Sequence, residues 1–205
     1  VGRGTTIENV QVSYSGDDSF EWFGGTVDGK RLIAYNGIDD DFDTDNGYSG
    51  RNQFCLGRRF RQVADQSTSQ AFESDNDASG SRNMPLTSAI FANCTLIGPL
   101  QDTSMVAGTG TQQYNRLFGS AAMVRRNSRL SVVNSLFIGW PNSMEIGNPN
   151  GGFTSDAASR DSLQFRNNTY IGIKGGSPGF RNAVPAGTTS FSAAWLLDPA
   201  NANEI

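Results

Sequence analysis

Three segments of the chain share one pattern around a phenylalanine. They read Asp17-Asp-Ser-Phe20-Glu-Trp-Phe23, Asp39-Asp-Asp-Phe42-Asp-Thr-Asp45 and Ser69-Gln-Ala-Phe72-Glu-Ser-Asp75. Side chains alternate between the two faces of a strand, so the phenylalanines point to one face and the acids that follow them point to the other. Fainter copies of the pattern surround Met123, Met144 and Phe180. The pattern therefore predicts one strand that recurs along the whole chain.

A second segment recurs about ten residues before each of these strands. It starts with an asparagine, continues with three or four mostly apolar residues and ends in a glycine or small turn; the starting residues are Asn9, Asn52, Asn93, Asn134 and Asn167, with a weaker copy at Lys30. The steps from Asn9 to Lys30 and from Lys30 to Asn52 are 21 and 22 residues. Two strands per repeat of this length are typical of a β-helix, whose stacked coils bury apolar faces that no single coil can bury.

The repeat predicts an all-β fold, a parallel β-helix of about six coils that forms a single domain over residues 1–205. Four stretches break the basic spacing, and we interpret them as loop insertions: 57–70, 77–86, 98–120 and 147–161. Neighbouring coils should lie about 4.8 Å apart, the spacing of paired strands. We expect the asparagines to form a ladder inside the coils, with each amide bonded to the next.

Composition excludes several classes of function. The net charge of −4 and the pI near 4.8 argue against nucleic-acid binding, which needs a basic surface. No apolar run approaches the roughly 18 residues of a membrane span. The chain has no histidine, so Ser-His-Asp and Cys-His nucleophilic sites and histidine zinc sites are excluded. Cys55 and Cys94 lie in apolar strands, where we interpret them as small core residues, with a disulfide as the alternative.

The acids of neighbouring coils should form two parallel rows about 5 Å apart. Like charges at this distance repel by on the order of 3 kcal/mol near a protein surface. Three arrangements relieve the repulsion: Ca²⁺ bound by the carboxylates, pairing with Arg58, Arg59 or Arg61, or protonation of some acids. The sequence leaves all three open. The candidate metal ligands are Glu21, Asp41, Asp43, Asp45, Glu73, Asp75 and Asp77.

Aromatic residues at turns are candidates for stacking on sugar rings. Tyr48 and Trp140 both lie at predicted turns, where we predict that they bind ligand, with burial in or over the core as the alternative. Trp22 alternates with Glu21 along a strand, so we expect it in the core.

The chain resembles secreted right-handed β-helix proteins of Bacteroidota-type bacteria, a group with pectate-lyase-like architecture. The resemblance covers roughly residues 3–146 and rests on Thr5-Thr-Ile-Glu-Asn-Val-Gln-Val-Ser-Tyr14, on the acidic segments around Phe20, Phe42 and Phe72, and on Arg125-Arg126-Asn127. It implies a right-handed solenoid on an exported or cell-surface protein. It implies no catalytic residue set, because this fold supports many functions.

Two functions remain open. The first is a non-catalytic extracellular or cell-surface module for adhesion, glycan binding or assembly, with Ca²⁺ as a stabilising ion. Val1 enters the first coil without a capping segment, so we interpret the chain as a part or mature fragment of a longer secreted protein that makes end-to-end contact with more chain or another subunit. The second is a Ca²⁺-dependent polysaccharide lyase with Arg58, Arg59 or Arg126 as its base, or a glycoside hydrolase that uses two carboxylates.

Overall fold

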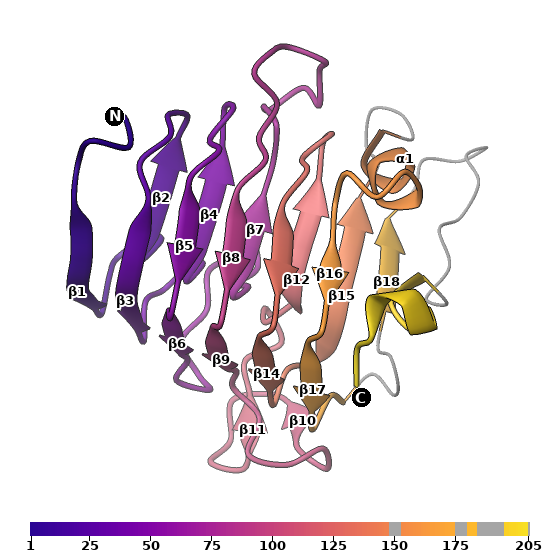
Figure 1. Ribbon diagram of the computed structural model, residues 1–205. Coiled ribbons are helices and arrows are strands. Elements are labelled where there is room, and N and C mark those ends of the chain that lie inside the picture. The colour runs from indigo at the N-terminus through magenta and orange to yellow at the C-terminus, as the bar shows by residue number, and fades with distance from the viewer. Residues whose placement is uncertain (148–152, 175–179, 184–194, 205) are drawn as a thin grey trace.

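The chain winds into a solenoid whose coils stack side by side from the N-terminus to the C-terminus (Figure 1). The computed structural model describes residues 1–147, 153–174, 180–183 and 195–204. All pairings between its named strands are parallel, as in the predicted β-helix.

Two curled sheets form the walls of the solenoid. The larger sheet has ten strands, in the order β16-β13-β8-β5-β3-β6-β9-β14-β17 with β1 beside β3. Its strands are β1 (Ile7–Ser13), β3 (Gly29–Tyr35), β5 (Arg51–Gln53), β6 (Leu56–Arg58), β8 (Ile90–Ala92), β9 (Thr95–Ile97), β13 (Ser131–Val133), β14 (Leu136–Ile138), β16 (Phe165–Arg166) and β17 (Thr169–Ile171). The six-stranded sheet contains β2 (Phe20–Phe23), β4 (Phe42–Asp45), β7 (Phe72–Ser74), β12 (Ser120–Arg125), β15 (Asn142–Gly147) and β18 (Phe180–Ala183).

The six-stranded sheet contributes one strand to each coil, which confirms the predicted number of coils. Its register also confirms the alignment on phenylalanine, since Phe20 pairs with Phe42 and Phe42 pairs with Phe72. In the next coil Ala122 occupies this column, not Met123 as the sequence pattern indicates. Met123 instead pairs with Glu73, in the column of acids.

Stacked aromatic rings fill the centre of the first coils. Phe42 lies 5.5 Å from Phe20 and 5.7 Å from Phe72, measured between ring centroids, and both pairs are stacked. Phe91 closes the same cluster from the opposite sheet, 4.8 Å from Phe72. Apolar residues therefore meet between the two sheets, and the register of one coil fixes that of the next.

The asparagine ladder lies at an outer corner of the larger sheet and not inside the coils. Asn9, Asn93, Asn134 and Asn167 have φ between 52° and 59°, and Arg31 and Phe54 occupy the same corner in the second and third coils. Asn134 donates a hydrogen bond to Asn93, as predicted for a ladder. Asn52 does not belong to the ladder, because it is buried and lies two residues before Phe54, which occupies the corner of its coil. Asparagine is favoured at the corner because it tolerates positive φ.

The residue after this corner points inward, which explains both cysteines. Cys55, Cys94, Ser135 and Asn168 occupy one buried column, since the strands that follow them are in register. Ser135 Oγ accepts from the backbone of Cys94, and Asn168 Oδ1 accepts from the backbone of Ser135. Both cysteines are free thiols, so the core interpretation is confirmed.

The insertions leave the solenoid between its strands. The stretch after β9 carries the short pair β10 (Val106–Ala107) and β11 (Gln113–Tyr114), and the stretch after β15 carries helix α1 (Phe153–Ser159). A 3-10 helix, Pro199–Asn201, lies near the C-terminus. No helix in the described part of the chain has the length and apolar character of a membrane span.

Candidate functional site

The acids that follow the phenylalanines lie on the outer face of β2, β4 and β7. Glu21 pairs with Asp43, and Asp43 pairs with Glu73, so the predicted carboxylate column exists. The inward positions beside it are occupied by Thr44 and Ser74, whose hydroxyls lie 2.7 Å apart. The column divides into two halves with different partners.

In the half nearer the C-terminus, arginines neutralise the acids. Arg125 pairs with Glu73, and its Nε lies 3.0 Å from an oxygen of Asp75. Arg126 pairs with the other oxygen of Asp75. These arginines come from the end of β12 and the turn after it, not from the insertion that carries Arg58, Arg59 and Arg61.

Two of the predicted ligands, Asp41 and Asp77, do not belong to this row. Asp41 is fully buried, and its Oδ1 lies 3.0 Å from Nη1 of the equally buried Arg59. Burial raises the pKa of Asp41 to about 6, and the nearby Arg59 opposes this rise. Asp77 lies past the end of β7, where it accepts hydrogen bonds from Ser79 and Ser81 that lower its pKa.

In the half nearer the N-terminus, which we call the acidic corner, carboxylates gather without an arginine in ion-pair contact. Oxygens of Asp18, Glu21 and Asp43 lie within 4.8 Å of one another, and so do those of Asp17, Asp18 and Asp39. Asp18 accepts a hydrogen bond of 2.8 Å from the backbone of Asp40. None of these five side chains makes an ion pair within the residues that the structure describes.

Burial and mutual repulsion raise the pKa of Asp18, Glu21, Asp39 and Asp43. Burial is the largest cause for Asp43, whose pKa rises to about 9, with the charge of Glu73 adding to it. Burial also raises the pKa of Asp18 to about 7, with contributions from Asp39 and Glu21. Burial also raises the pKa of Glu73 to about 7, although the charge of Arg125 opposes this rise. The pKa of Asp45 is raised as well, and burial is the largest cause.

The donor set suits a hard divalent cation. Ca²⁺ prefers carboxylate and carbonyl oxygens and takes six to eight of them. Oδ1 of Asp43 and Oδ1 of Asp39 are buried and accept no hydrogen bond from the described residues. Buried acceptors without partners are uncommon, so each has a free coordination position. Asp18, shared by both groups, would be the central ligand.

Asp17, Asp18 and Asp39 were not among the ligands predicted from sequence. The signal was present, since both Asp17 and Asp39 stand three residues before the aligned phenylalanines. Apart from Asp41, the prediction placed its ligands after the start of the strands, and so it missed most of the turn before them.

Tyr48 and Trp140 are fully buried, so the prediction that they bind sugar is wrong. The Tyr48 ring stacks on Trp22 at 5.1 Å, and its hydroxyl donates to Val27 O. Trp140 donates from Nε1 to the carbonyl of Leu96. Both turns fold back over the core, because burying a large aromatic ring removes its apolar surface from water and stabilises the fold. Trp22 packs against the core as expected.

A different set of aromatic residues forms an exposed cleft beside the acids. Tyr14, Tyr35 and Phe60 line it together with Ile38 and Val63, and its volume is about 490 Å³. Tyr14 is 71% exposed, and its ring meets the Tyr35 ring edge to face at 5.6 Å. The polar residues Ser15 and Asn36 complete the lining. Tyr14 follows β1 and Tyr35 ends β3, so the cleft lies at one corner of the first two coils.

The arginines predicted as lyase bases are engaged in the structure. Arg59 is fully buried against Asp41 and also donates to the carbonyl of Ile38. Arg126 pairs with Asp75, and Arg58 donates to the backbone of Arg59. A base must reach the proton that it removes. Buried Arg59 lacks that access.

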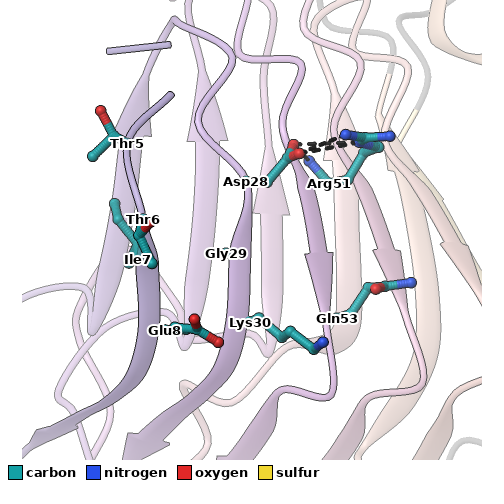
Figure 2. Close-up of a pocket in the computed structure, with 9 residues that line it drawn as sticks. All are labelled: Thr5, Thr6, Ile7, Glu8, Asp28, Gly29, Lys30, Arg51 and Gln53. Atoms are coloured by element: carbon teal, nitrogen blue, oxygen red, sulfur yellow. Dashed lines mark hydrogen bonds and ion pairs between the residues drawn. The ribbon is translucent and has the colours of Figure 1, made fainter. Parts of the chain in front are cut away.

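A hollow of about 460 Å³ lies over the first strands of the larger sheet (Figure 2). Figure 2 shows Asp28 and Arg51 pointing toward one another across its rim, and their closest atoms are 2.6 Å apart. Arg31 pairs with Glu8, another residue of the lining. Its acids thus already have partners, unlike those of the acidic corner.

The sequence of residues 1–184 matches the family model described as a pectate-lyase like beta helix domain. The match spans most of the chain, so the protein belongs to this family of β-helix domains. No significant match was found among curated proteins or among solved structures. The family gives the architecture, and the chemistry must be argued from the residues of this chain.

Proposed function

We propose that this chain is a non-catalytic extracellular or cell-surface module that binds glycan at the corner of its first two coils, with Ca²⁺ held by the carboxylates beside the cleft. One observation carries the proposal: the aromatic cleft and the arginine-free acids adjoin. Ser15 and Ile38 line the cleft, and Asp17 and Asp39 lie one or two residues further along the chain.

The cleft offers what a sugar ring needs. The apolar faces of sugars stack on aromatic rings, and Tyr14 presents most of its ring to solvent. Its volume of about 490 Å³ lies within the ordinary range for small-ligand sites. The hydroxyl of Ser15 and the amide of Asn36 lie at its rim, where they can bond to sugar hydroxyls.

The cation would have two effects at this corner. It would neutralise carboxylates that otherwise repel one another, and so stabilise the turns that carry Ser15 and Ile38. It would also supply coordination positions for hydroxyl or carboxylate oxygens of a bound glycan. Asp18 and Asp43 would hold the ion, with Asp39 and Glu21 beside them.

A glycan-binding assay with matched variants tests the proposal. The wild-type chain should bind members of a panel of bacterial and plant polysaccharides, and chelation of Ca²⁺ should weaken that binding. Tyr14→Ala should reduce affinity about fivefold, because one stacked ring contributes roughly 1 kcal/mol. Phe23→Ala removes an exposed ring outside the cleft and should leave binding unchanged. Equal loss in both variants, or no dependence on either, would refute the role of the cleft.

An activity assay separates the module from the lyase alternative. A lyase forms an unsaturated uronate that absorbs in the ultraviolet, and a hydrolase releases reducing ends. The proposal expects neither product from any polysaccharide that binds, with or without Ca²⁺. Turnover that disappears in Arg126→Gln would replace this proposal with the enzyme.

End-to-end contact is a further part of the proposal. Among the described residues, the edge strands β1 and β2 pair only with β3 and β4. Unpaired strand edges attract other strands. Sedimentation of the 205-residue chain should show self-association that rises with concentration, and a strictly monomeric chain would remove this part.

A further inference from the structure

A basic hollow lies at the edge of the solenoid opposite to the aromatic cleft. It has a volume of about 350 Å³ and is formed where β7, β12 and β15 end, by the loop after β7, the turn after β12 and helix α1. In Figure 1 this edge carries α1, whereas β1 and β3 end at the other edge. The hollow and the aromatic cleft have no lining residue in common.

Three arginines from three different segments converge on this hollow. Arg82 comes from the loop, Arg129 from the turn and Arg160 from the residue after α1. Asp156 is the only acid among the described residues that line it. The local charge is therefore positive in a protein whose net charge is −4. Such a reversal is not required by the fold.

Local contacts hold two of the guanidinium groups in place. Arg82 lies 4.2 Å over the centroid of the Phe153 ring. Arg129 donates from Nη1 to Ser162 Oγ at 3.0 Å, and its Nε is buried without an acceptor in the described part of the chain. Within that part, none of the three arginines forms an ion pair. Their donors remain available to an anion.

The rest of the lining is suited to a ring with hydroxyl groups. Met84, Leu86 and Phe153 supply an apolar wall. Asn127 is 3% exposed, and its Oδ1 accepts no hydrogen bond from the described residues, although its amide nitrogen donates to Ser81 O. A buried acceptor without a protein partner is open to a donor from a bound molecule. A simple anion has no such donor, whereas a sugar hydroxyl has one.

We propose that this hollow is a second binding site, for an acidic sugar whose carboxylate or sulfate is bound by Arg82, Arg129 and Arg160. Guanidinium groups bind both of these oxyanions through paired N–H donors. The volume accommodates one sugar-sized ligand. Phe153 and Met84 contact the ring, and Asn127 accepts from a hydroxyl. The site does not depend on the aromatic cleft or on Ca²⁺.

Calorimetric titration of the 205-residue chain with four probes tests the site. Glucuronate and glucose 6-sulfate distinguish the two anionic groups, while glucose and inorganic sulfate each carry half of the chemistry. At least one acidic sugar should bind, and more tightly than glucose or sulfate. Its affinity should fall as NaCl is raised, because salt screens charge interactions. Sulfate binding as tightly as both acidic sugars, or no binding of either sugar, would overturn the proposal.

Matched variants locate the binding. Arg129→Gln and Arg160→Gln should each weaken the acidic sugar about tenfold, the usual effect of one lost charge-assisted hydrogen bond. Arg116→Gln removes the same charge from an exposed position outside the hollow and should have no effect. A second measurement needs no variant: the acidic sugar should protect Arg129 and Arg160 from an arginine-selective dicarbonyl, as read by mass spectrometry. Equal effects of all three variants, or no protection, would contradict the site.

Discussion

The two halves of the acidic face share one strand register but have different electrostatic partners. Glu73 and Asp75 face Arg125 and Arg126, and their charges are matched. Asp18 and Asp43 stand in the preceding coils with no arginine near them in the described part of the chain. The same fold therefore neutralises one half and leaves the other half unpaired.

The proposed function assigns a structural role to one half of this surface and a binding role to the other. A row of acids on stacked strands is costly, and the arginine pairs show how the chain removes that cost where no ligand is needed. The arginine-free half retains it, with buried oxygens that have no hydrogen-bond partner. Perturbed groups of this kind gather at functional sites. Breaking each half separately tests this reasoning.

The largest effect should follow from removing the compensating charge. Arg125→Gln leaves Glu73 and Asp75 with one arginine between them, and we expect the free energy of unfolding to fall by about 2 kcal/mol at pH 8. Urea unfolding measures the change. Adding Glu73→Gln to this variant should restore most of the loss, because it removes the unpaired charge. A double variant no more stable than Arg125→Gln would show that packing, not charge, is responsible.

Stability should depend on pH in the direction set by the arginine-free half. Asp18 and Asp43 have folded-state pKa values of about 7 and about 9, above the ordinary value of 3.8 for an aspartate. The folded state therefore holds protons that the unfolded state has released, and stability falls as pH rises through these values. With a chelator present, we expect the unfolding temperature to drop by about 5 °C between pH 5 and pH 8.

Calcium should reverse this trend, since it binds the deprotonated carboxylates. Several acids have a lowered pKa, so they titrate below this window and should not contribute to the trend; they are Asp28, Asp65, Asp77 and Asp102. An unfolding temperature that stays flat or rises from pH 5 to pH 8 in chelator would contradict the assignment.

The smallest effect should come from removing one acid of the arginine-free half. At pH 8 folding obliges Asp43 either to take up a proton or to hold a poorly solvated charge, because its pKa rises to about 9 in the folded state. Asp43→Asn removes this cost, so in chelator at pH 8 we expect a gain of about 1 kcal/mol in unfolding free energy. The same change should abolish the response to Ca²⁺. Asp77→Asn is the matched control, because Asp77 accepts hydrogen bonds from Ser79 and Ser81 and should lose stability instead. Loss of stability in both variants would contradict the claim that Asp43 destabilises the fold while Asp77 stabilises it.

The repeat was readable from sequence because it follows the rules of stacking. Phe20, Phe42 and Phe72 are spaced as their packing demands, so their alignment predicted the register of the six-stranded sheet. The asparagine ladder was predicted correctly, but it lies outside the coils and not inside them. A corner residue in the αL conformation turns its side chain outward, and the residue after it points inward. Asn52 was misplaced because Phe54 occupies the corner of its coil.

The site was predicted only in part, because it depends on contacts between coils. The column of Glu21, Asp43 and Glu73 follows from the repeat itself. The pairing of Arg125 with Glu73 joins residues 52 positions apart across two insertions, 77–86 and 98–120, whose folding the repeat does not predict. Burial of Tyr48 and exposure of Tyr14 depend on how turns fold over the core, and residue type alone does not determine this.

Calorimetric titration of Ca²⁺ into the chain at pH 8 tests the central claim most directly. Asp18 belongs to both carboxylate groups, so it is the residue to change. The wild-type chain should bind Ca²⁺ with a Kd on the order of 0.1–1 mM, typical of extracellular sites. Asp18→Asn should abolish that binding, while Asp161→Asn, whose partner is Arg166, should retain it. Absence of binding to the wild-type chain at millimolar Ca²⁺, or equal binding to Asp18→Asn, would contradict the account.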